Sequence, residues 1–192
     1  MRIAFFGACG TGKTTLVKSI YEELNLKPLY NNARSIIAGL GIDDVSNIEP
    51  TKRALMLESI LISRIMKQIE ILDENFISDR SPIDELMYWE LDNDKNFPSL
   101  TPVIKRFVNS YLERFKYDLL VYVPIEFDLS EREKNEDKLR YVNEHRNIED
   151  EYVNAFYNKE KEELLYCKKI IKVSGSVEER IVQIKEALKE YN

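Results

Sequence analysis

Histidine and cysteine are scarce in this sequence. Its 192 residues include one histidine, His145, and two cysteines, Cys9 and Cys167. Two cysteines do not indicate the disulfide framework of a small secreted domain. One histidine excludes a zinc site or a catalytic triad that relies on several histidines.

Long apolar runs and an excess of positive charge are also missing. No stretch approaches the roughly 18 consecutive apolar residues of a membrane span, and residues 1–6 enter glycine-rich sequence without a secretory signal. We therefore expect a cytoplasmic protein without a membrane partner. The formal net charge is −6, from 28 basic and 34 acidic residues. Because proteins that coat nucleic acid need a basic surface, nucleic acid is not favoured as a partner. A homodimer remains open.

Short apolar segments alternate along the chain with segments of helical periodicity. Strands are expected at residues 2–6, 27–31, 76–78, 118–124 and 169–173, and helices at about 12–24, 51–74, from 81 onward, 100–115, 126–163 and 177–191. This alternation predicts a parallel sheet covered by helices on both faces. We expect an α/β fold, a three-layer sandwich with about five strands. No repeat or linker divides residues 1–192, so one domain is predicted.

A complete phosphate-binding motif, G-x-x-x-x-G-K-[ST], lies near the N-terminus. It consists of Gly7, Ala8, Cys9, Gly10, Thr11, Gly12, Lys13 and Thr14, and Thr15 follows it. Glycines let the backbone wrap closely around phosphates, and the N–H groups at the start of the next helix face the anion. Lys13 is expected to reach the β- and γ-phosphates, and the Thr14 hydroxyl to bind Mg²⁺. The predicted cofactors are ATP and Mg²⁺.

A second polar motif, Asp79-Arg80, follows the strand at 76–78. The GTPase motifs D-x-x-G and N-K-x-D do not occur, and a motor or AAA-type ATPase would place a glutamate where Arg80 stands. At the carboxyl end of a parallel strand, Asp79 would face the ligand crevice. There it could hold a magnesium water or accept a proton, and Arg80 could neutralise charge on the acceptor or on the transferring phosphoryl group. This pair favours a kinase.

The two motifs together resemble the P-loop nucleoside and nucleotide kinases, which share this fold. Ala33-Arg34 and the run from Asp79 to Asp84 narrow the resemblance to short kinases similar to the nicotinamide riboside kinase domain and to phage kinases of nucleotides or modified bases. The resemblance implies transfer of the γ-phosphoryl group of ATP to a small nucleoside- or nucleotide-like acceptor. It places Arg34, Asp79 and Arg80 at the acceptor, and Asp79 also at the metal.

The resemblance also implies a mobile lid over the ATP phosphates at about residues 126–146. Arg132, Arg140 and Arg146 are the candidates for contact with phosphate. We assign Arg132 to ATP binding and Arg140 to catalysis, together with Lys13, Asp79 and Arg80. A closing lid would exclude water and so favour transfer over hydrolysis.

One position departs from the related kinases, which often carry a glutamate shortly before the Ala-Arg pair. Here the stretch is Tyr30-Asn31-Asn32, without an acid. Three explanations stay open: Asp79 or Asp84 accepts the proton, the acceptor needs little help from a base, or the chain binds ATP for regulation without catalysis. A further alternative is a kinase of hydroxymethylated bases in DNA.

Overall fold

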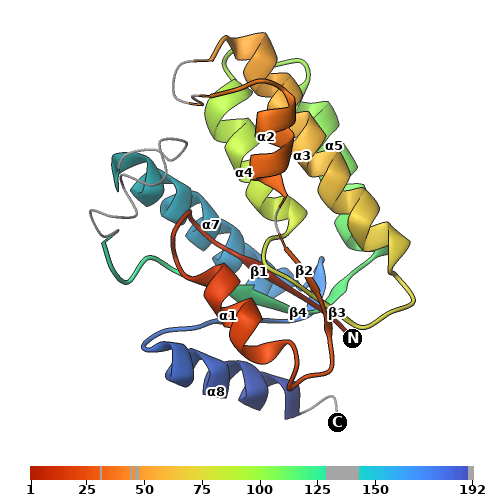
Figure 1. Ribbon diagram of the computed structural model, residues 1–192, viewed down its shortest axis with the longest axis vertical. Helices are drawn as coiled ribbons and strands as arrows, with labels where there is room; N and C mark the ends of the chain where they lie inside the picture. The colour runs from red at the N-terminus through yellow and green to blue at the C-terminus, as the bar shows by residue number, and fades with distance from the viewer. Residues whose placement is uncertain (31, 44, 46–47, 129–142, 190–192) are drawn as a thin grey trace.

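The computed structural model describes residues 1–30, 32–43, 45, 48–128 and 143–189. Its centre is a five-stranded parallel sheet in the order β2-β3-β1-β4-β5 (Figure 1). The strands are β1 (Arg2–Phe6), β2 (Lys27–Leu29), β3 (Phe76–Ser78), β4 (Tyr117–Tyr122) and β5 (Cys167–Lys172). The predicted α/β fold with about five parallel strands is confirmed.

Helices cover both faces of this sheet. They are α1 (Lys13–Ile20), α2 (Ala33–Gly39), α3 (Pro50–Glu70), α4 (Pro82–Asn93), α5 (Thr101–Arg114), α7 (Asn143–Glu163) and α8 (Val177–Leu188). In Figure 1, α1 and α8 lie on one side of the sheet, and α3, α4, α5 and α7 lie on the other. The three-layer arrangement is therefore as predicted.

The alternation of side chains in β1 explains the two cores. Ala4 and Phe6 pack into the core on the side of α3, α4, α5 and α7. Ile3 and Phe5 pack into the core against α1 and α8. Because both faces are covered by helices, the strand is apolar at every one of these positions.

The register of β1 brings its carboxyl end close to that of β3. Ala4 pairs with Ser78 of β3, and Phe6 pairs with Tyr122 of β4. The carboxyl ends of parallel strands meet at one edge of a sheet, where ligands bind. The loop after Phe6 and the residues after Ser78 consequently face the same crevice.

The structure differs from the prediction in two helical regions. α2 was not expected, because seven residues ending in a glycine show too little periodicity for a helix to be recognised. It packs through Ile37 against α3 and α4 in a third apolar cluster. The helix expected over residues 126–163 begins in the described part of the chain only at Asn143, and residues 125–128 before the undescribed segment are not helical.

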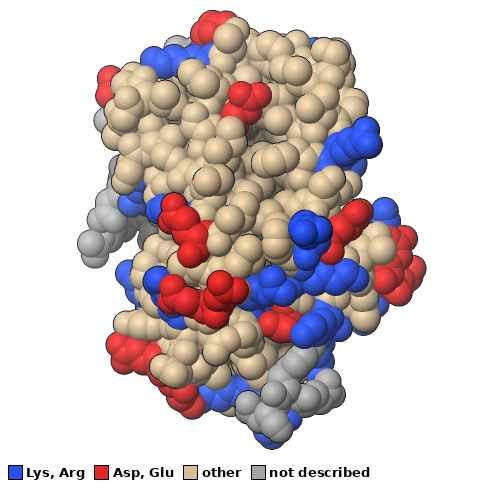
Figure 2. All heavy atoms as spheres, turned by 90° about the vertical axis from the view of Figure 1, so that its right-hand side faces the viewer, with Lys and Arg blue, Asp and Glu red and all other residues tan. Residues whose placement is uncertain are grey.

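The outward faces of α3 and α5 carry exposed apolar side chains. Leu55, Ile62 and Met66 of α3 and Val103 and Phe107 of α5 are 46–60% exposed. In Figure 2, the upper half of this face has few charged side chains, whereas acidic and basic ones intersperse below. Exposed apolar surface can mark an interaction surface, and the homodimer stays a prediction. Within the described residues, no helix combines the length and the apolar character needed to span a bilayer.

Candidate active site

The phosphate loop joins β1 to α1 through glycines in conformations that other residues avoid. Gly7 has a φ of 147°, and a Cβ atom at this position would lie 2.4 Å from the carbonyl oxygen of Val123. Gly12 has a φ of 92° and is the residue immediately before α1. Both positions therefore require glycine, and they turn the chain so that the N-terminus of α1 faces the crevice.

Lys13 folds back over this loop. Its Nζ atom donates to the carbonyl oxygens of Gly7, at 2.8 Å, and Ala8, and to Thr11 Oγ1 at 3.2 Å. Burial, and next the positive charge of Arg80, lower the pKa of Lys13 to about 8. A bound anion would stabilise the charged form of the ammonium group, and this is the form that binds the β- and γ-phosphates.

Thr14 and Asp79 form a pair suited to Mg²⁺. The Thr14 hydroxyl donates to Asp79 Oδ2 at 3.0 Å, and Asp79 is only 3% exposed. Its second oxygen, Oδ1, is buried without a hydrogen-bond partner among the described residues. Such an oxygen fits a cation or a water bound to one. Among the described residues, no group of three or more His, Cys, Asp or Glu side chains could hold a metal ion by itself. The residues present therefore fit a magnesium ion that takes its other ligands from phosphate and water.

Asp84 connects the start of α4 to the phosphate loop. Its Oδ2 accepts a hydrogen bond from the Ser81 N–H at 2.8 Å, as part of a capping box. Its Oδ1 accepts one from the Gly7 N–H at 3.0 Å and lies 3.4 Å from Arg80 Nη1. Because Asp84 is fully buried, this carboxylate supports the loop and Arg80.

Helix α7 holds the phosphate loop from the other side. Glu149 Oε2 accepts a hydrogen bond from the Cys9 N–H at 2.8 Å, and Arg146 Nε donates to the Cys9 carbonyl oxygen at 2.9 Å. Tyr88 of α4 donates to the same Glu149 oxygen at 3.4 Å. Burial raises the pKa of Glu149. Sequence reasoning missed Glu149, because in a long charged helix only its three-residue spacing from Arg146 distinguishes it, and that spacing is common.

Arg180 of α8 is a further support that the sequence did not reveal. It donates to the carbonyl oxygen of Thr11 at 3.0 Å and to that of Gly175 at 2.9 Å. Its Nη2 pairs with Glu126 at 2.7 Å, and Glu126 also accepts the Gly175 N–H. Arg180 therefore fixes the phosphate loop to the turn between β5 and α8. No motif surrounds it, so no sequence signal marks it.

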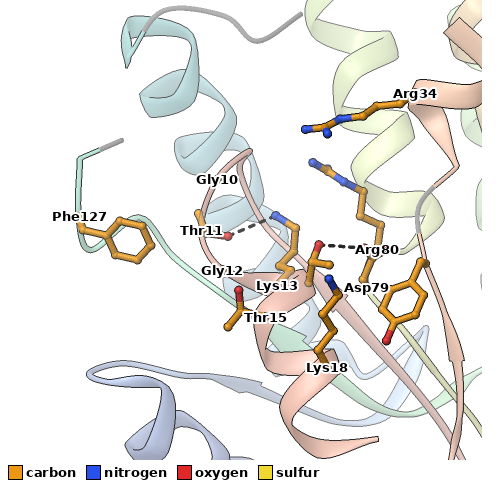
Figure 3. A pocket seen from close by; sticks show the side chains of 12 residues that line it. Gly10, Thr11, Gly12, Lys13, Thr15, Lys18, Arg34, Asp79, Arg80 and Phe127 are labelled. Carbon is orange, nitrogen blue, oxygen red and sulfur yellow. Dashed lines mark hydrogen bonds between the residues drawn. The ribbon is translucent and has the colours of Figure 1, made fainter. Parts of the chain in front are cut away.

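These elements enclose a cleft of about 610 Å³. Its lining consists of Gly10, Thr11, Gly12, Lys13, Thr14, Thr15, Lys18, Tyr30, Arg34, Asp79, Arg80 and Phe127. Figure 3 shows Lys13 at its centre, Phe127 on the side of Gly10 and Thr11, and Arg34 and Arg80 on the opposite side. The predicted residues from Gly10 to Thr15 and the three acceptor candidates thus share one cleft.

The other predicted site residues lie outside this lining. Gly7, Ala8 and Cys9 belong to the phosphate loop but do not line the cleft. Their backbone atoms form hydrogen bonds with Asp84, Lys13, Glu149 and Arg146. Of the lid candidates, Arg132 and Arg140 lie outside the described residues. Arg146 is 2% exposed and contacts the loop backbone. Lys18, Tyr30 and Phe127 line the cleft and were not predicted, because none belongs to a motif.

A buried polar network lies between α3, α4 and β3, next to Arg80. Arg64 and Glu85 form a two-pronged ion pair with both distances at 2.7 Å, and they are 5% and 3% exposed. Gln68 accepts hydrogen bonds from Tyr111 and Tyr117, and Ser78 donates to the Arg80 carbonyl oxygen at 2.6 Å. The network fixes the backbone from which Arg80 projects.

Comparison with known proteins agrees with this geometry. A family model described as an AAA domain matches residues 2–180. The chain belongs to this AAA domain family. The family description names no reaction, and Arg80 stands where an AAA-type ATPase would carry a glutamate. No curated protein matches the chain.

Solved structures share its fold at low sequence identity. Deoxyadenosine kinase from M. mycoides with bound dCTP is 18% identical with a TM-score of 0.67, over 99% of this chain and 100% of that one. The same enzyme with the products dCMP and a flexible dCDP is 20% identical with a TM-score of 0.71, over both whole chains. The NadR protein in complex with NAD and AMP-PNP is 18% identical with a TM-score of 0.64, over 98% of this chain and 48% of that one. These likenesses show the P-loop kinase fold.

Proposed function

We propose that this protein is a phosphotransferase that moves the γ-phosphoryl group of ATP, with Mg²⁺, to a nucleoside- or nucleotide-like acceptor. One observation carries the proposal: a single cleft joins residues Gly10 to Thr15 of the phosphate loop and of the start of α1 to the Asp79-Arg80 pair, with Arg34 on the side opposite Phe127. Solved kinases with the same fold, deoxyadenosine kinase and NadR, add support.

The described residues divide the work between binding and charge stabilisation. The N–H groups at the start of α1 and the Lys13 ammonium group bind the phosphates of ATP. Thr14 and Asp79 would hold Mg²⁺, which neutralises charge on the β- and γ-phosphates when it is bound. Arg80 stabilises the charge of the transferring group, since its planar fork matches phosphate oxygens.

The arrangement favours transfer over hydrolysis. Among the described residues that line the cleft, Asp79 is the only carboxylate, and it accepts the Thr14 hydroxyl. The residue that follows Asp79 in the sequence is an arginine, so no second acid adjoins Asp79 there to activate water.

We further propose that residues 126–146 form the lid of a single domain and that Arg132 and Arg140 act within this lid. We also propose that the protein works in the cytoplasm.

The test is ADP release from ATP and Mg²⁺, first alone and then with nucleosides, nucleoside monophosphates, nicotinamide riboside and hydroxymethylated DNA. Lys13→Ala is the control that removes the phosphate-binding cation. We expect ADP release that depends on an acceptor and disappears in Lys13→Ala. Brisk ADP release without an acceptor would indicate an ATPase. Tight ATP binding without turnover on any acceptor would indicate a regulatory nucleotide-binding module.

A further inference from the structure

We propose that the outward faces of α3 and α5 bind a second copy of this chain, related by a twofold axis that sets each helix antiparallel to its counterpart. This inference does not depend on the reaction in the cleft. It rests on the spacing, the exposure and the charge order of the side chains on these two helices.

Helix α3 carries a second apolar stripe on the side away from its core. Its inward face packs into the core through Leu57, Leu61 and Ile65. The outward stripe, with alternating spacings of four and three residues, consists of Leu55, Ser59, Ile62, Met66 and Ile69. The Ser59 hydroxyl donates to the Leu55 carbonyl oxygen at 2.7 Å, so the stripe contains no unsatisfied hydroxyl donor. This spacing is the heptad pattern by which helices pack on one another, and a helix that is apolar on two sides is expected to be covered on both.

Helix α5 repeats the pattern. Its inward residues Val108 and Leu112 are buried. Its outward stripe, with spacings of three, four and three residues, consists of Leu100, Val103, Phe107 and Ser110. Val103 is 60% exposed and Phe107 is 46% exposed. Two helices of one chain therefore present the same kind of seam.

The two helices are neighbours that run in the same direction. Tyr111 of α5 donates to Gln68 of α3 at 2.7 Å. One turn or more earlier on both helices, Ile104 of α5 packs against the cluster that contains Leu57 and Ile60 of α3. Both helices lie at the upper right of Figure 1, and Figure 2 looks onto this side, where the upper half has few charged side chains. The two stripes therefore belong to one patch.

The apolar area of the patch is what one partner of a dimer needs. Its large apolar side chains are 39–60% exposed. Side chains of this size expose on the order of 100 Å² each when half exposed, so the seven together present roughly 600 Å², the upper end for the largest patch on a monomer. A standard interface takes about 800 Å² from each partner, of which a little more than half is apolar.

The order of charges beside the stripes favours a second copy of the chain. Each helix has an exposed basic residue before its acidic one: Lys52 and Glu70 on α3, and Arg106 and Glu113 on α5. Two copies aligned in the same direction would bring like charges together. Antiparallel copies bring the basic end of each helix to the acidic end of its counterpart, which is favourable.

The pairing is also self-complementary, as twofold symmetry requires. In such an interface a residue contacts a second residue of the other copy, and that second residue returns the contact. Arg106 and Glu113 meet this condition, because each can face the other across the axis. Lys52 and Glu70 meet it as well, although Lys52 Nζ also lies 3.3 Å from the Gly41 carbonyl oxygen.

Neighbouring charges on the two helices belong to contacts within the chain. Lys105 of α5 pairs with Glu90 at 2.8 Å, and Arg53 of α3 pairs with Asp92 at 2.6 Å. The charge order that a second copy would meet is therefore set by the four exposed residues.

Sedimentation equilibrium of the full chain over a concentration series tests the proposal. We expect a mass that approaches twice that of one chain as concentration rises. Ile62→Glu should raise the Kd for self-association about 100-fold or more, because symmetry places two carboxylates in the apolar centre. Val182→Glu on α8 is the matched control, since Val182 and Ile62 are both 53% exposed. Circular dichroism verifies that both variants are folded.

Two results would overturn the proposal. The first is a monomer at every concentration of the unmodified protein, which would assign the patch to a different partner or to none. The second is the same Kd for Ile62→Glu and Val182→Glu, which would place the contact on another face.

Charge reversal tests the antiparallel arrangement itself. Arg106→Glu should raise the Kd for self-association about tenfold, because symmetry replaces two attractive contacts with two repulsive ones. Adding Glu113→Arg to Arg106→Glu restores opposite charges in reversed order and should return the Kd to within about threefold of the unmodified protein. A double variant that associates no better than Arg106→Glu would refute the antiparallel pairing.

Discussion

Removal of the Glu149 side chain is expected to weaken both the fold and ATP binding. This carboxylate is 3% exposed and accepts two hydrogen bonds, from the Cys9 N–H and from the Tyr88 hydroxyl. A hydrogen bond to a charged group contributes about 1.5–3 kcal/mol. Burial, which raises the pKa of Glu149, offsets part of that contribution. We therefore expect Glu149→Ala to lower the free energy of unfolding by about 2 kcal/mol, and the Tm by about 4–8 °C.

The same change should reach the nucleotide. Glu149 and Arg146 bind the N–H and the carbonyl oxygen of the same residue, Cys9, so together they fix the orientation of its backbone in the phosphate loop. Glu149→Ala removes the hydrogen bond to the Cys9 N–H. We therefore expect the Kd for ATP to rise about tenfold, equivalent to ~1.4 kcal/mol. Glu149→Gln keeps an oxygen acceptor for the Cys9 N–H and should retain most of the affinity.

Thermal unfolding and calorimetric titration with ATP measure the two effects. Glu151→Ala, at an exposed glutamate of the same helix, is the matched control for charge and helix propensity. Identical Tm and Kd values for Glu149→Ala and Glu151→Ala would refute the role of α7 as a support of the phosphate loop.

Three other predictions concern titration, metal and the buried ion pair. Because the pKa of Lys13 is lowered to about 8, ATP binding above that pH must take up a proton, so the Kd for ATP should be about tenfold higher at pH 9 than at pH 7; a flat profile in a calorimetric pH series would contradict this. Asp79→Asn should lower kcat about 100-fold or more and weaken the dependence of kcat on added Mg²⁺. ATP binding measured in EDTA should change little. An unaltered Mg²⁺ titration would exclude Asp79 from the metal site. Arg64→Met should lower the free energy of unfolding by about 3–5 kcal/mol, because it leaves Glu85 buried and unpaired. The double variant Arg64→Met with Glu85→Leu should recover most of this loss in a urea titration. A double variant as unstable as Arg64→Met would contradict the unpaired charge as the cause.

The features that could be predicted from the sequence are those formed by residues that are contiguous in the chain. The phosphate loop is a complete motif between an apolar strand and a helix, so its residues, its position and its glycine conformations all follow from residues 7–14. Asp79 could be placed as well, because it follows the short apolar strand at 76–78, and parallel strands share the edge at which they end. All five strands could be predicted because each one is a short run of neighbouring residues.

The supports of the site could not be predicted, because they depend on contacts between distant segments. Glu149, Arg146 and Arg180 look like ordinary members of charged helices, and only the packing of α7 and α8 against the loop turns them inward. Among the lid candidates, Arg146 contacts the loop backbone, whereas Arg132 and Arg140 lie outside the described residues. Helix α2 was missed because its seven residues are stabilised mainly by Ile37 in a cluster with α3 and α4.

The fate of the γ-phosphoryl group tests the central claim most directly. ATP labelled at the γ-phosphorus is incubated with the protein, Mg²⁺ and the nucleoside and nucleotide acceptors, and the label is followed into each product. The account predicts that the label enters an acceptor, that little inorganic phosphate forms, and that Lys13→Ala abolishes the transfer. Label recovered as inorganic phosphate whether or not an acceptor is present would contradict it.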